Sequence, residues 1–436
     1  MKRFLAWLLP IALCACAESH AATTQSALEA SPTAAPPYRV APRQAVHPWN
    51  GGDRDRLSSA LAADFANASV SGASGVAVVA DDGTVVFDLR GNRSMTPAST
   101  MKLFVGSTAL FTLGQSRRLF TEFKSLSLPD GDGAIDDLWL VGGGDPVLTS
   151  DDLVRGVGML RRAGVRAIRS LNVDASAFAG PEQNPGWLRD DDRYDYAAGT
   201  SALSLDWNVV KTVVDGAQVY RPIANIPDYV GGVVRELLKR TGIAIDRVQF
   251  GTAPLGATKL WAHPSPTIGE LVHQMFYESD NHIAEQLLRS LGAEDGIGTD
   301  AAGARAERAF LSAIEVPAEG LRIVDGSGLA PGDRASARTL AGLLARLAGL
   351  PDGPEFIRDL PRAGIEGTVR YHAFTDAAGR VRAKSGHIDG VNALAGYVQT
   401  RSHGRVAFAF IVNRPSLDDD AVERTYDRAL DRLSEF

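Results

Sequence analysis

The chain has 436 residues and a formal net charge of −7, and its composition is 45% hydrophobic and 22% charged. This balance is that of an ordinary globular protein of two or three domains, and it excludes a disordered or fibrous chain. The acidic charge argues against a general nucleic-acid-binding protein. The two cysteines, Cys14 and Cys16, exclude a disulfide framework, a cysteine-ligated zinc site and a cysteine nucleophile in the rest of the chain.

The N-terminus is predicted to be a bacterial signal peptide. Basic residues at positions 2 and 3 precede an apolar run of 14 residues, which is shorter than the roughly 20 residues of a membrane span. Ala15-Cys16-Ala17 fits ordinary cleavage after residues 1–17 and release into the periplasm, whereas Leu13-Cys14-Ala15-Cys16 resembles a lipobox that would leave Cys16 lipidated on the outer membrane. Residues 18–48 are rich in proline and alanine and are predicted to be a tether.

Folded sequence is predicted to begin near Gly51. Hydrophobic periodicity and turn residues predict, in chain order, a helix over 53–65, a hairpin over 75–80 and 84–90, a helix over 99–113, a strand over 138–141, a helix over 151–162, a strand over 167–173, a hairpin over 208–220 and a helix over 227–240. The chain then becomes strongly helical over 270–291, 302–313 and 336–347, and ends in strands over 381–384, 392–400 and 405–413 and a helix over 418–433.

This order predicts a mixed α/β (α+β) fold with one discontinuous main domain. The early hairpin and the late strands are expected to share a central antiparallel sheet flanked by helices, and the middle segment is expected to be an inserted accessory lobe. The predicted parts are 49–113 and 264–436 for the main domain and 114–263 for the insertion.

Ser99-Thr100-Met101-Lys102 is the only S-x-x-K sequence in the chain and stands at a predicted helix start. Positions i and i+3 lie on one helix face, so the hydroxyl and the amine can meet. A serine hydroxyl needs an adjacent base, and lysine serves as one only when its pKa falls from about 10.4 toward 7. Burial and a second nearby cation both lower it. Alone, the pattern also fits a helix-start serine with a surface lysine.

Two further motifs follow along the chain. Ser279-Asp280-Asn281 lies between two helical stretches, where it is either a helix cap or a source of a proton-relaying hydroxyl and a substrate-binding amide. A competing S-x-N, Ser170-Leu171-Asn172, lies on a predicted strand. Lys384-Ser385-Gly386 ends the strand that begins at Val381, where a cation, a hydroxyl and a glycine at a sheet edge can receive an extended substrate and its terminal carboxylate.

The three motifs in this order resemble those of the serine penicillin-recognising enzymes, S-x-x-K, S-D-N and K-T-G. Because 180 positions separate Ser99 from Ser279, the chain is similar to the class C low-molecular-mass penicillin-binding proteins, the D-alanyl-D-alanine carboxypeptidase/endopeptidase family. The resemblance covers residues 55–430, includes Asp325-Gly326-Ser327-Gly328-Leu329, and implies a β-lactamase/transpeptidase-like domain.

The resemblance also implies a mechanism. A periplasmic serine D,D-peptidase would use Ser99 to form an acyl-enzyme on peptidoglycan stem peptides, with Lys102 taking the serine proton. Ser279 and Lys384 would carry a proton to the leaving amine, and Lys384 would also lower the pKa of Lys102 by charge repulsion. Penicillins and other β-lactams would be covalent inhibitors, and no metal or organic cofactor is implied.

The resemblance further implies a substrate-binding set: Asn281, Lys384, Ser385, Gly386 and His387. Backbone N–H groups of Ser99 and His387 would form the oxyanion hole. Two members depart from the family pattern, because Ser385 replaces the usual threonine and His387 stands where a hydroxyl residue is usual. The first change keeps the hydroxyl, whereas the second removes one that could bind the substrate carboxylate.

Other functions remain open at this stage. A β-lactamase or esterase could use the same site, although no carboxylate stands out to activate a deacylating water, and a non-catalytic cell-wall-binding protein could retain it as a vestige. No G-x-S-x-G or H-E-x-x-H sequence occurs. His273, His282 and Glu285 are therefore expected to be helix-surface or core residues and not metal ligands. The sequence leaves open the oligomeric state and the preference between carboxypeptidase and endopeptidase activity.

Overall fold

The computed structural model describes residues 47–67, 70–214, 216–414, 416 and 418–436. The predicted signal peptide, Cys16 and nearly all of the predicted tether lie outside the described residues. The strands are β1 (Ser74–Ala80), β2 (Val85–Leu89), β3 (Arg118–Ser125), β4 (Ala134–Gly142), β5 (Ala167–Asp174), β6 (Val209–Val214), β7 (Ala217–Pro222), β8 (Ala244–Phe250), β9 (Thr258–Thr267), β10 (Val381–Ile388), β11 (Val391–Gln399) and β12 (Arg405–Asn413).

Most helices lie close to their predicted positions; the exceptions are the helix predicted over 99–113, which is divided into three short elements, and a helix over 353–359, which the sequence did not predict. The α-helices are α1 (Gly51–Asp64), α2 (Lys102–Thr108), α3 (Ser150–Arg162), α4 (Ile226–Arg240), α5 (Ile268–Glu278), α6 (Asn281–Ala293), α7 (Asp300–Ala313), α8 (Ala337–Ala348), α9 (Gly353–Asp359) and α10 (Asp419–Glu435). Short helical turns are η1 (Ala98–Met101), η2 (Ala109–Leu113), η3 (Arg189–Arg193), η4 (Asp195–Ala197), η5 (Asp206–Asn208) and η6 (Gly367–Val369). Within the part of the chain described, no helix combines the length and the apolar character needed to cross a membrane.

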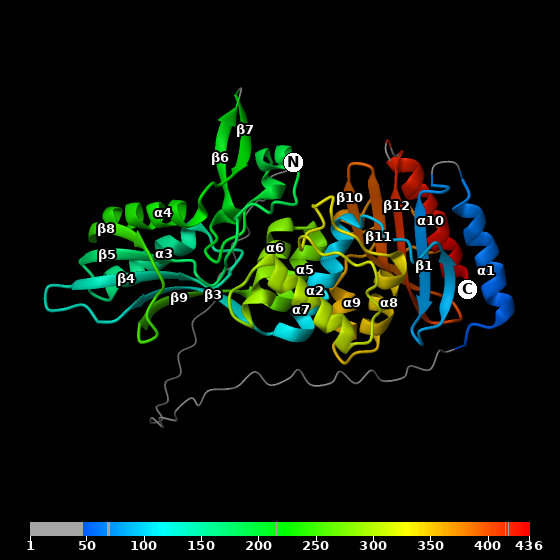
Figure 1. Ribbon diagram of the computed structural model, residues 1–436, viewed down its shortest axis with the longest axis horizontal. Helices are drawn as coiled ribbons and strands as arrows, with labels where there is room; N and C mark the ends of the chain where they lie inside the picture. The colour runs from blue at the N-terminus through cyan, green and yellow to red at the C-terminus, as the bar shows by residue number, and fades with distance from the viewer. Residues whose placement is uncertain (1–46, 68–69, 215, 415, 417) are drawn as a thin grey trace, which may run out of the picture. The chain divides into compact units, whose positions relative to one another are not determined.

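The main sheet has the order β10-β11-β12-β1-β2, and every pair in it is antiparallel. The predicted union of the early hairpin with the late strands is thereby confirmed (Figure 1). All seven residues of β1 are buried, because both faces of the sheet are covered. Ala77 and Val79 pack with the side of the core that contains α2, α5 and α8, whereas Val76 and Val78 pack with α1 and α10. This double burial explains the nearly continuous apolar run of β1.

The middle segment forms a sheet of its own with the order β8-β5-β4-β3-β9. Its β4–β5 and β5–β8 pairs are parallel, and its β3–β4 and β3–β9 pairs are antiparallel. Helices α3 and α4 supply apolar side chains to the core of this sheet, and β6 and β7 form a separate hairpin (Figure 1). The mixed α/β fold class is confirmed, and the domain boundaries at 114 and 263 stay predictions.

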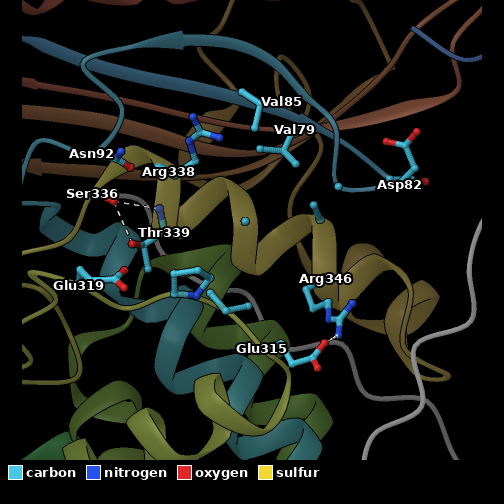
Figure 2. Close-up of a pocket in the computed structure, with 16 residues that line it drawn as sticks. Val79, Asp82, Val85, Asn92, Glu315, Glu319, Ser336, Arg338, Thr339 and Arg346 are labelled. Atoms are coloured by element: carbon cyan, nitrogen blue, oxygen red, sulfur yellow. Dashed lines mark hydrogen bonds and ion pairs between the residues drawn. The ribbon is translucent and has the colours of Figure 1, made fainter.

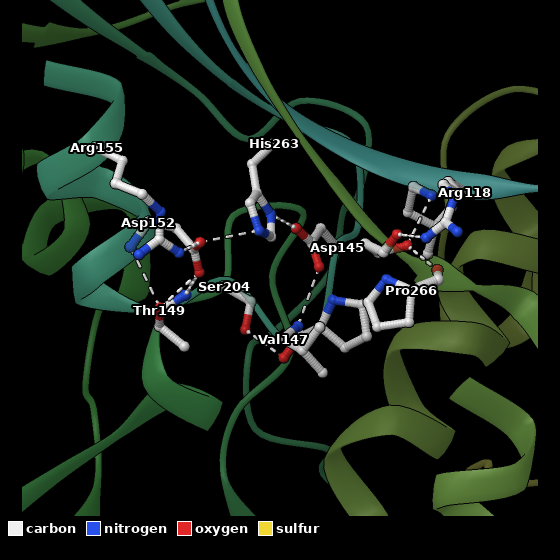
Figure 3. Close-up of polar contacts among 12 residues, drawn as sticks. Arg118, Asp145, Val147, Thr149, Asp152, Arg155, Ser204, His263 and Pro266 are labelled. Carbon is white, nitrogen blue, oxygen red and sulfur yellow. Dashed lines mark hydrogen bonds and ion pairs between the residues drawn. The ribbon is translucent and has the colours of Figure 1, made fainter. Parts of the chain in front are cut away.

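A histidine joins three parts of this inserted region. His263 on β9 places Nδ1 2.7 Å from Asp145 Oδ2 and Nε2 3.2 Å from Asp152 Oδ1 (Figure 3). Asp145 is fully buried in the loop after β4, and Asp152 shares a capping box with Thr149 at the start of α3. The hydrogen bond to Asp145 raises the pKa of His263 above its ordinary 6.5. The imidazolium therefore links β9 to the loop and to α3.

We expect this link to make stability depend on pH. Because the folded-state pKa of His263 is raised, its stabilisation is fully present below about pH 6.5 and is lost as the pH rises through the folded pKa. His263→Asn should therefore lower the free energy of unfolding more at pH 6 than at pH 9. Urea unfolding of both proteins at the two pH values measures the difference. An equal loss at both pH values would show that the charge on His263 contributes nothing.

Candidate active site

The three sequence motifs meet at one buried cluster of side chains. Lys102 Nζ donates hydrogen bonds to Ser99 Oγ at 3.0 Å, to Asn281 Oδ1 at 2.6 Å and to the carbonyl oxygen of Ser327 at 2.7 Å. Lys384 Nζ donates to Ser279 Oγ at 2.8 Å. Both lysine side chains are completely buried. The structure thus brings together an amine and a hydroxyl twice, once within S-x-x-K and once between S-D-N and K-S-G.

The S-x-x-K motif lies on two helical turns instead of the single helix predicted over 99–113. Residues Ala98–Met101 form the tight turn η1, α2 starts at Lys102, and the chain continues into the wider turn η2. In a 3₁₀ turn the side chains at i and i+3 are eclipsed, so the tighter geometry places Lys102 directly over Ser99. The correction to the predicted helix therefore strengthens the reason for their contact.

The S-D-N motif is a sharp break between α5 and α6. Ser279 ends α5 in the left-handed conformation with φ 59°, and Asp280 caps α6 by accepting a hydrogen bond from the N–H of Ile283 at 3.0 Å. The inserted region holds this turn from outside. Trp207 Nε1 donates to Asp280 Oδ2 at 3.0 Å, and Asn281 Nδ2 donates to the carbonyl of Tyr196 at 2.9 Å. The motif is consequently both a cap and a positioned part of the site.

The K-S-G motif lies inside β10, which continues to Ile388 and does not end at Lys384 as predicted. β10 is the last strand of the main sheet, and its Gly386 lies against the Ser99 turn. A Cβ atom at Gly386 would lie 2.8 Å from the carbonyl oxygen of Pro97 and 3.0 Å from the backbone nitrogen of Ser99, so only glycine allows this approach. Ser385 Oγ is 2.9 Å from Thr368 Oγ1 on η6.

His387 has an acidic neighbour that the sequence did not indicate. Its side chain is 61% exposed, and its Nδ1 lies 3.4 Å from Asp419 Oδ1 at the start of α10. Asn392, its partner in the β10–β11 register, also donates a hydrogen bond to Asp419, at 3.0 Å. The imidazole therefore lies beside α10, and its predicted role in substrate binding stays a prediction.

Burial controls the charge of the two lysines. It lowers the pKa of Lys102 from 10.5 to about 8, against the opposing effect of the Asp325 and Glu285 carboxyl groups. The pKa of Lys384 lies well below 10.5, because burial and then the charge of Lys102 disfavour its ammonium form. The sequence predicts that burial and the charge of Lys384 both lower the pKa of Lys102. In the structure burial accounts for the low pKa of Lys102, and the charge repulsion between the two amines lowers the pKa of Lys384 instead.

Several contact residues of the site have no signature in the motifs. The Ser327 carbonyl belongs to the 325–329 stretch that the family resemblance includes, but a backbone contact cannot be recognised from residue type. Trp207, Tyr196, Thr368 and Asp419 come from distant parts of the chain. Glu285, expected to be a core or helix-surface residue, is 1% exposed and accepts hydrogen bonds from that loop. Its position four residues after Asn281, on one helix face, is the signal that could have identified it.

Other candidates lie elsewhere. Asn172 of the competing S-x-N donates to Asp137 within the second sheet. A cavity of about 1060 Å³ opens between the β1–β2 hairpin, the 315–319 loop and α8, and none of the predicted site residues lines it (Figure 2). Among the described residues, no group of three or more histidine, cysteine, aspartate or glutamate side chains could hold a metal ion.

Known proteins match both the sequence and the fold. The family model described as D-Ala-D-Ala carboxypeptidase 3 (S13) matches residues 57–219 and 214–435. Carboxypeptidase DacB of Mycolicibacterium smegmatis is 30% identical over 433 residues, which cover 93% of this chain and 90% of that protein. The D-alanyl-D-alanine carboxypeptidase of Actinomadura sp. (strain R39) is 29% identical over 417 residues, which cover 78% of this chain and 77% of that protein.

A solved structure extends the match to the fold. Penicillin binding protein 4 (dacB) from Haemophilus influenzae superposes with a TM-score of 0.78 at 20% identity, covering 88% of this chain and 100% of that chain. The fold and the paired serine–lysine contacts thus define a serine D,D-peptidase of the low-molecular-mass penicillin-binding type. This chain belongs to the D-Ala-D-Ala carboxypeptidase 3 (S13) family and is a hydrolase of the D-Ala-D-Ala carboxypeptidase class. The family and the enzyme class predicted from the motifs are confirmed.

Proposed function

We propose that the protein hydrolyses peptidoglycan stem peptides that end in D-Ala-D-Ala, through an acyl-enzyme on Ser99, as a carboxypeptidase or an endopeptidase. One observation carries the proposal: a completely buried Lys102 places its amine 3.0 Å from the Ser99 hydroxyl. With a pKa of about 8, roughly a tenth of this amine is uncharged near neutral pH, and that uncharged form can accept a proton, whereas an ordinary lysine has almost none.

The acylation step follows from this geometry. Lys102 takes the proton of Ser99 Oγ as the oxygen attacks the carbonyl carbon of the D-Ala-D-Ala peptide bond. The negative charge on the carbonyl oxygen is stabilised by the backbone N–H groups of Ser99 and His387, since Gly386 lets β10 lie against the Ser99 turn. The extended substrate pairs along the edge of β10, and Asn281 contacts its acyl-side amide.

The second lysine serves the leaving group. Two buried amines in one site cannot both stay charged, so one can accept a proton while the other donates one. Ser279, whose Oγ accepts a hydrogen bond from Lys384 Nζ at 2.8 Å, passes its proton to the departing amine and receives another from Lys384. The C–N bond then breaks and the acyl group remains on Ser99, from which water releases it. A substrate carboxylate beside Lys384 restores the charge that burial disfavours.

The relatives support β-lactams as inhibitors of the same serine. The Haemophilus penicillin binding protein 4 has been solved in complex with a β-lactam. A β-lactam offers a strained amide to the serine, and its ring-opened acyl group stays attached when deacylation is slow. We therefore include penicillins among the compounds that acylate Ser99.

The test combines a substrate and a label. The purified protein should release D-alanine from a peptide ending in D-Ala-D-Ala, and a fluorescent penicillin should label it with a lifetime of many minutes. Label that is lost within seconds, with no D-alanine release, would identify a β-lactamase. Absence of both label and D-alanine release from folded protein would favour a non-catalytic cell-wall-binding protein.

We also propose that the enzyme works in the periplasm, where peptidoglycan is accessible. The basic and apolar N-terminal residues support export, and Cys16 supports a lipid anchor. Fractionation of cells that express the full chain, followed by mass spectrometry of its N-terminal peptide, separates a released form from a lipidated one.

A further inference from the structure

Helix α6 presents two side chains toward Lys102, one helical turn apart. Asn281 starts the helix, and its Oδ1 accepts a hydrogen bond from Lys102 Nζ at 2.6 Å. Glu285 follows four positions later, which places it on the same face of the helix. Its side chain is 1% exposed, and the mechanism derived above gives it no role.

Glu285 reaches Lys102 through one peptide segment. Its Oε1 accepts hydrogen bonds from the backbone N–H of Ser327 at 2.9 Å and of Gly326 at 3.2 Å. The carbonyl of the same Ser327 accepts the hydrogen bond from Lys102 Nζ at 2.7 Å. The carboxyl group of Glu285 thus holds the N–H of Ser327, and the carbonyl of Ser327 holds the amine of Lys102. A shift of the carboxyl group would move the carbonyl and with it the amine.

The loop between them has no room to adjust. A Cβ atom at Gly326 would lie 2.7 Å from the carbonyl oxygen of Ala284 on α6. Gly328 has φ +79°, and a Cβ there would lie 1.9 Å from the carbonyl oxygen of Ala98, next to the nucleophile turn. Residues 325–328 are therefore wedged between α6 and η1. The position that Glu285 imposes on this loop is transmitted to Ser99 and Lys102 together.

We propose that Glu285 is a positioning residue for the hydrolysis: it holds the Ser327 carbonyl that orients the Lys102 amine toward Ser99, and near neutral pH it does so as an uncharged acid. The proposal rests on the proposed function, in which Lys102 is the base. A carboxylate at this position would stabilise the ammonium form of Lys102 and oppose its action as a base. An uncharged carboxyl group keeps the hydrogen bonds to the loop without that electrostatic effect.

The charged surroundings support the uncharged form. The titratable groups that interact electrostatically with Glu285 are Asp325 from the loop, Asp333 from the chain that follows it, Asp300 and Glu307 from α7, and Lys102 from α2. Burial and the charge of Asp325 raise the pKa of Glu285 to about 8. Burial also raises the pKa values of Asp333 and Glu307 well above their ordinary range. Arg289, on α6 itself, is paired with Asp300 at 2.6 Å.

The test is the pH profile of acylation by a fluorescent penicillin, measured from pH 5 to 10. In Glu285→Gln the amide still accepts the loop hydrogen bonds but can never ionise. In wild type Glu285 ionises around pH 8 and then stabilises the ammonium form of Lys102, whereas the glutamine cannot. The rising limb, which reports Lys102, should therefore move to lower pH in Glu285→Gln by about half to one unit relative to wild type. In Glu285→Ala the maximal acylation rate should fall about 10- to 100-fold, and Glu285→Gln should recover most of that loss.

Glu307→Gln is the matched control, because it removes an equally buried acid that has no hydrogen bond to the 325–328 loop among those of the described residues. Its rising limb should coincide with that of wild type. Thermal unfolding checks that each variant is folded; should Glu285→Ala fail to fold, the Glu285→Gln and Glu307→Gln profiles decide the question. An unshifted limb in Glu285→Gln would reject the proposal. A wild-type protein that no penicillin acylates would instead reject the proposed function.

Discussion

Replacement of Ser99 by alanine is expected to abolish acylation and to reduce D-alanine release on the order of a millionfold, the scale seen when a serine hydrolase loses its nucleophile. Ser99 is the serine whose Oγ lies 3.0 Å from Lys102 Nζ, and no second nucleophile replaces it at that position in the described site. After treatment of wild type with benzylpenicillin, mass spectrometry of a digest should place the adduct on the peptide that contains Ser99. The Ser99→Ala protein should carry none.

A matched control comes from the same helical region. Ser107 is a completely buried serine on α2, and its hydroxyl donates to the carbonyl of Phe104 at 3.1 Å. Ser107→Ala makes the same chemical change outside the site, so this variant should be labelled like wild type. An adduct on Ser279 or Ser327 of the wild-type protein would contradict the assignment of the nucleophile, since both hydroxyl-bearing residues border the same site.

Most residues of the site could be predicted from three short sequence motifs. Ser99 and Lys102 are three positions apart, so their contact follows from helical geometry alone. Ser279 and Lys384 are 105 positions apart, and their contact was expected only because the motif order resembled a known family. The resemblance therefore supplied the long-range pairing, whereas the periodicity of the chain supplied the local elements.

The parts that sequence reasoning missed share a physical cause. The Ser327 carbonyl holds Lys102 through a backbone atom, which every residue type possesses. Trp207 holds Asp280 across 73 positions from within the inserted region, a distance that no local pattern reports. β9 was missed because Pro264 and Pro266 interrupt it, and proline usually argues against a strand. The strand forms nevertheless, paired along one side with β3 at the edge of its sheet.

The charge state of the lysines shows a further limit of the sequence. A nearby cation was expected to lower the pKa of Lys102, but the fold surrounds that amine with carboxyl groups that act in the opposite direction. Complete burial outweighs them, and burial can be known only once α2, α6 and β10 are assembled. The repulsion between the amines then lowers the pKa of Lys384. Both lysines become usable in proton transfer: burial, one of the two predicted causes, lowers the pKa of Lys102, whereas the charge repulsion acts on Lys384.

Lys384→Arg is expected to reduce the acylation rate about 100- to 10 000-fold, the usual contribution of a positioned proton-transfer group. Lys384 is completely buried, donates to Ser279 Oγ at 2.8 Å, and has a pKa that burial holds well below 10.5. A guanidinium keeps the positive charge but does not lose a proton, and its planar fork cannot reproduce the geometry of an ammonium group. The kcat for a D-Ala-D-Ala peptide should therefore fall much more than its KM rises.

Steady-state kinetics with the peptide and single-turnover acylation with penicillin measure the two effects separately. Lys124→Arg is the matched control, because Lys124 forms an ion pair with Glu122 at 2.7 Å in the second sheet, away from the nucleophile, and an arginine can keep that pair. It should leave both constants unchanged. If Lys384→Arg raises KM while kcat stays at the wild-type value, Lys384 only attracts the substrate carboxylate. The proton would then reach the leaving amine without passing between Lys384 and Ser279.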